Sequence, residues 1–322
     1  MKKYIFIFLL TALTFSCGEE NKKESEIAKV PLPKVEIERF DKAFFEGGPE
    51  KLPELKQKYP EFFPAEYTDQ MAIRDMKDPF MNLLKNKAQE KFPSLDYLKD
   101  DVAQMLQHIK YYYPQLPVPG KVATVIYADT DIKSVYTNQE ILVPLSLYLG
   151  KDNEVYKDHF PDYKLPEFEP SQILPDLVTS FSEDKIPPPK DRTLLGLMIY
   201  YGKQLYMKDL LIPEVADHDK ICYTKEQLEW AKVNEFEIWS YFVDRKLLFE
   251  SDSKLPARFI NPAPFSKFYL ELDNESPGRI GQWLGWQIVR SYAENNKNVP
   301  LQQLMAMDAK EIFDNSKYKP KK

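Results

Sequence analysis

Apolar residues recur at helical spacing along much of this chain. The clearest run lies near the end of residues 50–113, where apolar side chains are three or four positions apart: Leu95, Leu98, Val102, Met105, Leu106 and Ile109. This spacing places them on one face of a helix, and Ser94 is a residue type suited to cap its N-terminus. The pattern therefore predicts that residues 50–113 are helical.

The next two segments have the composition of β-strands. Residues 121–128 (KVATVIYA) and 139–149 (QEILVPLSLYL) are rich in β-branched and aromatic residues, which favour extended backbone. An Asp-Thr-Asp turn at 129–131 separates them. We expect a small sheet here, followed by a proline-dense stretch, 160–190, that encloses one short helix around 173–181.

Helical patterns return in the second half. Asp191 is placed to cap a helix that runs to Leu211. One face of this helix is apolar and is formed by Leu194, Met198, Tyr201 and Leu205. Because it carries few charges, we expect it to be central and buried on most sides. Thr224 and Gln227 form a capping-box pair that opens a second helix ending at about Phe249.

A third helix is expected after the Ser-Pro-Gly turn at 276–278. In it, Gly281 and Gly285 are four positions apart, with Trp283 and Trp286 beside them. Glycines at this spacing allow another backbone to approach closely, so we interpret the motif as a packing surface. Together these patterns predict an α+β fold, a mostly helical domain with a small β-sheet.

The N-terminus has the pattern of an export signal. Two lysines precede an apolar run, 4–13, and Ser16 stands directly before Cys17. The run is too short to span a bilayer as a helix. It predicts a lipoprotein signal peptide over 1–16, cleavage before Cys17 and thioether lipidation of its sulfur, with palmitate as an acyl chain of the anchor. The alternative is an ordinary secretory signal in which the cysteine is incidental.

The signal also sets the expected organisation of the chain. Residues 17–34 are polar and charged and end in Pro-Leu-Pro, which predicts a lipidated cysteine followed by a flexible tether. Residues 35–322 are then expected to form a single globular domain. This arrangement places the protein in the cell envelope, held to a membrane outside the cytoplasm.

Composition narrows the partners. Removing Lys2 and Lys3 with the signal leaves 44 − 2 = 42 basic and 50 acidic side chains, a formal net charge of −8. Such a chain has no long-range attraction to nucleic acid. Once Cys17 is lipidated, Cys222 is the one remaining cysteine, so no intramolecular disulfide forms. Stability must come from packing of an aromatic-rich core.

Common catalytic signatures are missing from the sequence. It contains no His-Glu-x-x-His, Gly-x-Ser-x-Gly or Cys-x-x-Cys motif. Its three histidines, His108, His159 and His218, would have to converge from separate segments to bind zinc. A nucleophilic Cys222 near His218 and a cation site in the acidic turn at 273–275 are weaker candidates. We expect no catalytic residue, metal or cofactor.

Glu235 is the most unusual residue of the second helix, because it lies within an apolar stripe. The stripe consists of Leu228, Ala231, Ile238 and Phe242. A buried carboxylate has to be paired, hydrogen-bonded or protonated. An ion pair with Lys203 or Arg290, or a position at the rim, would make Glu235 structural. Otherwise it belongs to a binding site.

Long segments of the chain together resemble one family. They are VEIERFDKAFF (35–45), LKQKYPEFFP (55–64), YYYPQLPVP (111–119), HFPDY (159–163), MIYYGKQLYMKDLLIP (198–213), RFINPAPFSKFYLELDNESPGRIGQWLGWQIVRSY (258–292) and SKYKP (316–320). With the lipoprotein signal, they resemble the gliding motility lipoprotein B family (GldB) of Bacteroidetes bacteria. The resemblance implies an envelope lipoprotein needed for surface gliding, whose partners are envelope proteins of the gliding machinery and the associated type IX secretion system. It implies no catalytic activity.

The order of elements also resembles the gluzincin type of zinc peptidase. If the helices correspond, Tyr200 and Gln204 stand where that family has its two zinc-binding histidines, and Tyr201 replaces its general-base glutamate. Glu235 would then be the remaining zinc ligand. Because neither Tyr200 nor Gln204 is a good zinc ligand, the resemblance implies a zincin-like scaffold without metal, whose vestigial cleft is formed by these four residues.

We therefore predict a lipid-anchored, non-catalytic component or assembly factor of the gliding machinery. One alternative is an envelope hydrolase of zincin descent with unorthodox ligands. A second is a solute- or glycan-binding lipoprotein with a cleft lined by aromatic residues such as Trp283, Trp286 and Tyr201.

Overall fold

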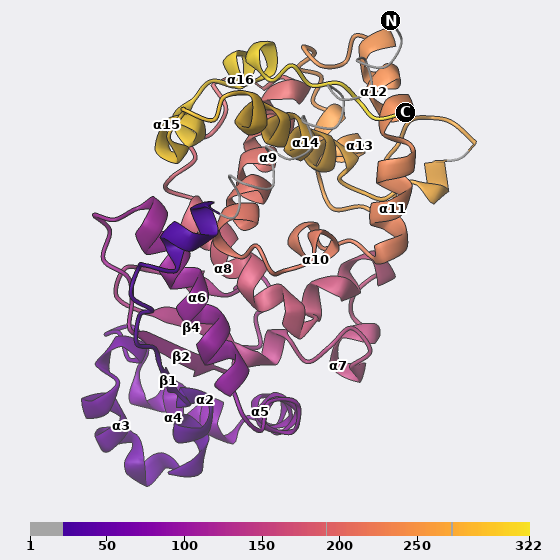
Figure 1. The fold of residues 1–322 in the computed structure, drawn as a ribbon. Coiled ribbons are helices and arrows are strands. Elements are labelled where there is room, and N and C mark those ends of the chain that lie inside the picture. Colours follow the sequence, from indigo (N-terminus) through magenta and orange to yellow (C-terminus); the bar gives the residue numbers. More distant parts are fainter. Residues whose placement is uncertain (1–21, 191, 272) are drawn as a thin grey trace, which may run out of the picture.

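The structure is a computed structural model that describes residues 22–190, 192–271 and 273–322. The predicted signal peptide, the lipidated Cys17 and the cap at Asp191 lie outside these residues. Figure 1 shows the small sheet with short helices at one end of the molecule, and a larger helical region at the other. The α+β prediction, mostly helical with a small sheet, is confirmed.

The sheet has four short strands in the order β1-β2-β4-β3. They are β1 (Glu36–Glu38), β2 (Lys121–Val125), β4 (Ile141–Pro144) and β3 (Val135–Tyr136). β1 and β4 both pair with β2 in parallel, and β3 pairs with β4 antiparallel. The predicted strands correspond to β2 and β4. Both β1 and β3 were missed, because two or three residues are too few to show an alternating pattern.

Helices fill most of residues 40–112, which confirms the prediction for 50–113 and adds the unpredicted helix α2 (Phe40–Glu46) before it. The others are α3 (Leu52–Lys58), α4 (Asp69–Lys77), α5 (Pro79–Lys91) and α6 (Asp96–Tyr112), with 3-10 turns η1 (Pro49–Lys51) and η2 (Pro60–Phe62). The predicted apolar face of α6 is buried, from Leu98 to Ile109. The prediction that Ser94 is the N-cap is wrong by one position: Leu95 is the N-cap residue, and the Ser94 hydroxyl accepts a hydrogen bond from the Asp96 backbone N–H at 3.2 Å.

The second half consists of helices joined by proline-rich connections. They are α7 (Glu154–Lys157), α8 (Ile173–Ser182), α9 (Leu194–Leu211), α10 (Asp217–Ile221), α11 (Lys225–Val233), α12 (Glu235–Asp244), α13 (Leu255–Phe259), α14 (Ile280–Asn295), α15 (Leu301–Ala306) and α16 (Ala309–Asn315). The observed cap of α9 is Thr193, whose hydroxyl accepts from the Gly196 N–H at 3.0 Å.

The prediction of a single helix from Thr224 to Phe249 is wrong. The capping box of Thr224 and Gln227 is present, but α11 ends at Val233 and α12 runs only from Glu235 to Asp244. Asn234 interrupts the helix, and its side-chain amide donates to the carbonyl of Trp230 at 2.8 Å. An asparagine that bonds to nearby backbone in this way competes with helical hydrogen bonding.

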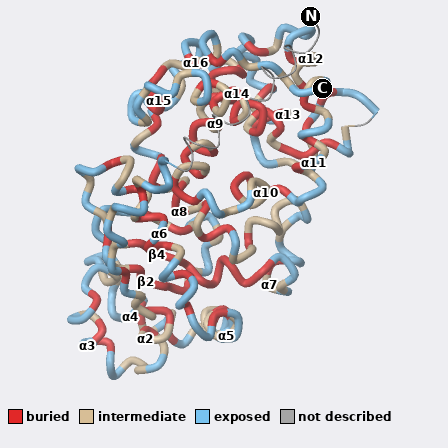
Figure 2. Tube along the Cα trace, viewed as in Figure 1, coloured by how far each residue is buried: buried red, intermediate tan, exposed pale blue. Residues whose placement is uncertain are grey.

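Helices α9 and α14 form the centre of the helical region, which we call the helical heart. A Cβ atom at Gly285 would overlap the Met198 carbonyl oxygen, and one at Gly202 would overlap the backbone of Gly285. The two backbones are therefore in direct contact, and the predicted packing role of this glycine helix is confirmed. Figure 2 shows buried segments around α9 and α14, and also through α6, α8 and the strands β2 and β4.

A second, smaller core lies at the opposite end and defines the N-terminal lobe, residues 40–77. Its buried side chains are Phe40, Phe44, Leu52, Leu55, Tyr59, Ala72 and Met76, which pack with Val125 of β2. The lobe is thus attached to the rest of the protein through the sheet.

Residues 22–34, part of the predicted tether, lie against α6. The Tyr111 hydroxyl donates to Glu26 at 2.9 Å, and the Gln107 amide donates to the Val30 carbonyl at 2.6 Å. Ile27 is buried. These contacts differ from the flexible tether that we expected over 17–34, while the domain boundary at Val35 stays a prediction. Among the described residues, no helix combines the length and apolar character needed to cross a membrane.

Candidate functional site

Glu235 is buried, as its place in the apolar stripe predicted, and its side chain has a specific partner. It is 5% exposed, and it accepts a hydrogen bond of 2.7 Å from the hydroxyl of Tyr318 in the C-terminal segment. Tyr318 also packs edge-on against Trp239 of α12. Burial, followed by the bond to Glu235, raises the pKa of Tyr318. This pair therefore fixes the C-terminal segment to α12.

The prediction of an ion pair between Glu235 and Lys203 or Arg290 is wrong, because both cations have other partners. The Lys203 amine donates to the carbonyls of Met305 and Met307, at 2.9 and 2.5 Å. Arg290 binds Asp209 and Asp217 through its guanidinium at 2.7 to 3.0 Å. Glu235 is thus held by a neutral hydroxyl, a partner that helical spacing could not indicate.

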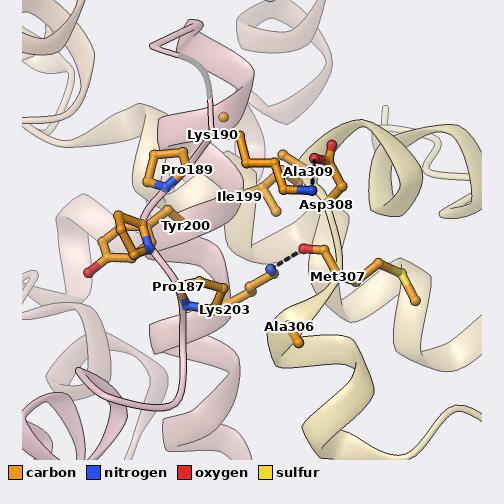
Figure 3. Close-up of a pocket in the computed structure, with 12 residues that line it drawn as sticks. Pro187, Pro189, Lys190, Ile199, Tyr200, Lys203, Ala306, Met307, Asp308 and Ala309 are labelled. Carbon is orange, nitrogen blue, oxygen red and sulfur yellow. Dashed lines mark hydrogen bonds and ion pairs between the residues drawn. The ribbon is translucent and has the colours of Figure 1, made fainter.

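Lys203 lines a small pocket of about 60 Å³ between α9 and the segment that joins α15 to α16 (Figure 3). Its amine points away from solvent, and burial lowers the pKa of Lys203 to about 8. Tyr200 lines the same pocket, whereas Tyr201, Gln204 and Glu235 do not. This pocket therefore does not unite the four residues of the predicted vestigial cleft, and that cleft stays a prediction.

The aromatic cleft expected around Trp283 and Trp286 is not formed by these residues. The two side chains are 1% and 0% exposed. The indole N–H of Trp286 donates to Asp209 at 2.8 Å, and the Arg290 guanidinium lies 3.7 Å from the centre of the Trp286 ring. These tryptophans are core residues that join α14 to α9, which removes the basis for a solute- or glycan-binding cleft at this place.

The remaining candidate residues have structural surroundings. Among the described residues, no group of three or more His, Cys, Asp or Glu side chains could hold a metal ion. His108 Nδ1 lies 2.7 Å from the Leu210 carbonyl oxygen, and burial lowers the pKa of His108. Burial also raises the pKa of the Cys222 thiol, which disfavours the reactive thiolate. The Asp273 carboxylate accepts three backbone N–H groups of 268–270 and so fixes its own loop.

A different site, which we call the aromatic cleft, opens between the N-terminal lobe and the sheet. It has a volume of about 430 Å³. Six of its lining residues are aromatic: Phe40, Phe44, Phe45, Phe62, Tyr67 and Tyr127. Aliphatic lining residues include Met81 of α5, Val125 of β2 and Leu142 of β4. Val125 and Leu142 belong to the neighbouring parallel strands β2 and β4, and their register places both on the same face, so the cleft lies against one face of the sheet.

The rings of the cleft are held in place by one another. Phe40 stacks on Phe62 with ring centres 4.3 Å apart, and it meets Tyr59 edge-on at 5.1 Å. Phe45 meets Phe44 edge-on at 5.0 Å. Such contacts are favourable beyond simple burial, so the walls are preformed rather than assembled by a ligand.

Carboxylates supply the polar part of the lining. They are Asp41, Glu61, Asp75 and Glu140, and no lysine or arginine is among the described residues that line the cleft. Asp41 is buried and accepts two bonds of 2.8 Å from Arg39 and one of 2.5 Å from Thr124. Asp75 accepts a bond of 2.8 Å from the Tyr67 hydroxyl. The hydrogen bonds of these two acids therefore stabilise the walls of the cleft.

The remaining two carboxylates share one cation with a third. The Lys121 amine lies 2.5 Å from Glu61, 3.4 Å from Glu38 and 3.7 Å from Glu140. Although burial disfavours its charge, the bond with Glu61 and the neighbouring acids raise the pKa of Lys121. Burial also raises the pKa of Glu140, against the attraction of Lys121. One ammonium thus stands among three carboxylates at the edge of the cleft.

The aromatic cleft was not predicted from the sequence. Its residues come from segments 40–45, 61–67, 75–81, 125–127 and 140–142, which no short motif connects. The signal present in the sequence was the density of Phe and Tyr with interspersed acids over 40–67. We treated these rings as core, and for Phe40 and Phe44 that is also true.

The fold and the cleft define a mostly helical α+β protein with a preformed aromatic cavity beside a small sheet. The family model described as "Gliding motility protein GldB" matches residues 20–320, so the chain belongs to this family. Membership identifies a gliding motility lipoprotein and indicates the cell envelope as its location. No curated protein and no solved structure matches the chain, so the resemblance to gluzincins stays a prediction.

Proposed function

We propose that this protein is a non-catalytic gliding component, anchored through lipidated Cys17, that binds another envelope protein in its aromatic cleft. The partner belongs to the gliding machinery or to the associated type IX secretion system. Family membership supports the role in gliding. The single structural observation that carries the binding proposal is the aromatic cleft itself, with its volume of about 430 Å³.

The cleft has the character of a binding site. Ligand pockets are mostly apolar cavities of roughly 300 to 1,000 Å³ with a few placed polar groups. Phe45, Phe62 and Tyr67 line this one and are only partly buried. Apolar surface left in contact with water is a source of binding free energy, because a partner that covers it releases that water.

Two of the four acids in the cleft have structural partners and are not positioned as catalysts. A general acid or base needs a proton site directed at the substrate. The Asp41 carboxylate is occupied by Arg39 and Thr124, and Asp75 is occupied by Tyr67. Their positions are those of residues that hold the walls of the cleft together.

Filling the cleft tests the binding proposal. Leu142→Trp adds an indole to the lining, and we expect loss of colony spreading with nearly unchanged protein abundance and thermal unfolding. Val243→Trp is the control, since Val243 is exposed on α12. Normal spreading of cells whose only copy is Leu142→Trp would show that the cleft is not needed for gliding.

The anchor is tested separately. Cys17→Ala removes the sulfur that would carry the acyl chains. Since at least two chains are needed for stable attachment, we expect an unprocessed or soluble protein in membrane fractionation. A variant that is processed normally and stays with the membrane would contradict lipidation at Cys17.

A further inference from the structure

We infer that the aromatic cleft receives a short segment of the partner protein in which a lysine or arginine is flanked by apolar side chains. This inference rests on the proposed function, since it names the chemistry of the partner at the same site. The lining of the cleft, its charge and its size each support this chemistry.

The aromatic walls suit a cation. The faces of Phe and Tyr rings carry negative electrostatic potential and attract ammonium and guanidinium groups. One ring of the cleft already does so within the protein, because the Lys85 amine lies 5.7 Å from the centre of Phe45. A basic side chain of a partner that enters between the rings would meet further faces of the same kind.

The charge at the edge of the cleft also favours a basic group on the ligand. Glu38, Glu61 and Glu140 share Lys121, and Glu38 also attracts Lys58, which leaves a local charge of 2 − 3 = −1. The other two acids of the lining have their own cations: Arg39 binds Asp41 at 2.8 Å, and Arg74 lies 3.0 Å from Asp75. The uncompensated charge therefore lies on the side of Glu140, where it attracts a basic group and repels an acidic one.

The aliphatic lining residues and the size of the cleft indicate that the ligand carries more than a cationic group. Met81, Val125, Ile126 and Leu142 also line it, and burying them demands apolar groups on the ligand. A volume of about 430 Å³ exceeds what one side chain fills. A peptide segment with apolar residues beside a lysine or arginine satisfies both requirements, whereas a glycan would bring many hydroxyls to a wall that offers few free hydrogen-bonding groups.

Site-specific photo-cross-linking in intact gliding cells tests this inference. A photoreactive amino acid replaces Pro64, an exposed residue of the cleft lining, in the full-length chain so that the cleft itself stays open, and the captured adduct is identified by mass spectrometry. We expect a protein segment with Lys or Arg next to apolar residues. Glu140→Lys in the same chain should reduce the adduct at least tenfold, and Glu140→Gln should reduce it less. Glu237→Lys, the same charge change on exposed Glu237 of α12, is the control and should leave it unchanged.

Several results would overturn the inference. They are an acidic or wholly apolar segment, a lipid or glycan adduct, absence of any adduct, or an adduct equally abundant with Glu140→Lys. Thermal unfolding of Glu140→Lys and Glu140→Gln shows whether either variant acts by misfolding, and equal loss with both variants at normal stability would also contradict the charge argument. The proposed function fails differently, through normal gliding of Leu142→Trp cells. A gliding defect with an acidic captured segment would overturn only the basic character of the partner segment.

Discussion

The helical heart and the N-terminal lobe use the same residue types in opposite ways. In the heart, Trp283 and Trp286 are completely enclosed, and glycines bring the backbones of α9 and α14 into contact. In the lobe, phenylalanines and tyrosines surround a cavity of about 430 Å³. An aromatic-rich stretch therefore does not by itself distinguish core from site. Whether such a stretch becomes core or site depends on the shapes of the elements that meet there.

The physical origin of this difference is helix length. α9 and α14 have 18 and 16 residues and can interlock over several turns. α2 and α3 have seven residues each, and each is followed by a short 3-10 turn that begins with proline. Such short elements cover one another incompletely, which leaves room for the aromatic cleft.

The largest effect is expected from breaking the heart at Gly285. Alanine normally favours a helix over glycine by about 1 kcal/mol, but here its Cβ would overlap the Met198 carbonyl oxygen. We expect Gly285→Ala to lower the free energy of unfolding by more than about 3 kcal/mol. Gly120→Ala is the control, because its Cβ would lie 3.4 Å from the nearest atom. Chemical denaturation measures both, and equal stability of the two variants would contradict the close contact.

A smaller effect, with a definite pH dependence, is expected at Lys203. Its pKa falls from 10.5 to about 8 on folding, so between these values the unfolded chain binds more protons than the folded one. Stability should therefore rise with pH across this window through Lys203, by on the order of 2 to 3 kcal/mol. Below about pH 8 the full penalty of burying the charge is present.

The difference in stability between the wild type and a variant without the Lys203 amine separates the contribution of Lys203 from that of other titrating groups. Lys203→Met removes the titrating amine, so the wild-type stability minus that of Lys203→Met should increase from pH 8 to 10. Lys190→Met is the control in the same pocket, because the Lys190 side chain is 83% exposed. A difference that stays flat over this range would show that Lys203 titrates normally.

The Glu235–Tyr318 pair should contribute less. Tyr318→Phe leaves the buried Glu235 carboxylate without its 2.7 Å donor, which costs about 1 to 3 kcal/mol. Glu235→Gln retains an acceptor for the hydroxyl, so we expect a loss of about 1 kcal/mol or less. Thermal unfolding distinguishes the two variants, and a Glu235→Gln variant less stable than Tyr318→Phe would indicate a cation near Glu235 instead.

No effect at all is predicted from metal removal. Structural metal binding adds folding free energy, so we expect the same unfolding temperature with and without chelator and no stoichiometric zinc after dialysis. About one zinc per chain would favour the hydrolase alternative and return attention to Glu235 and the three histidines.

The fold could be predicted from the sequence further than the site. The buried face of α6 and the Gly281–Gly285 helix follow from spacing within one element, and both were predicted. The break at Asn234 was missed because helix patterns on either side continue in phase. Tyr318 and its partner Glu235 are 83 positions apart. The aromatic cleft joins residues of the N-terminal lobe to strand residues about 80 to 100 positions further along the chain. Periodicity carries no information about such distant contacts.

The central claim is that function resides in the aromatic cleft, while the rest of the fold supports it. Single-cell gliding speed, measured against protein abundance for Leu142→Trp and Tyr318→Phe, tests this most directly. We predict that Leu142→Trp abolishes gliding at normal abundance, and that Tyr318→Phe slows cells only as far as its abundance falls. Normal speed with Leu142→Trp, together with a loss of gliding by abundant Tyr318→Phe, would contradict it and place the function at the C-terminal segment.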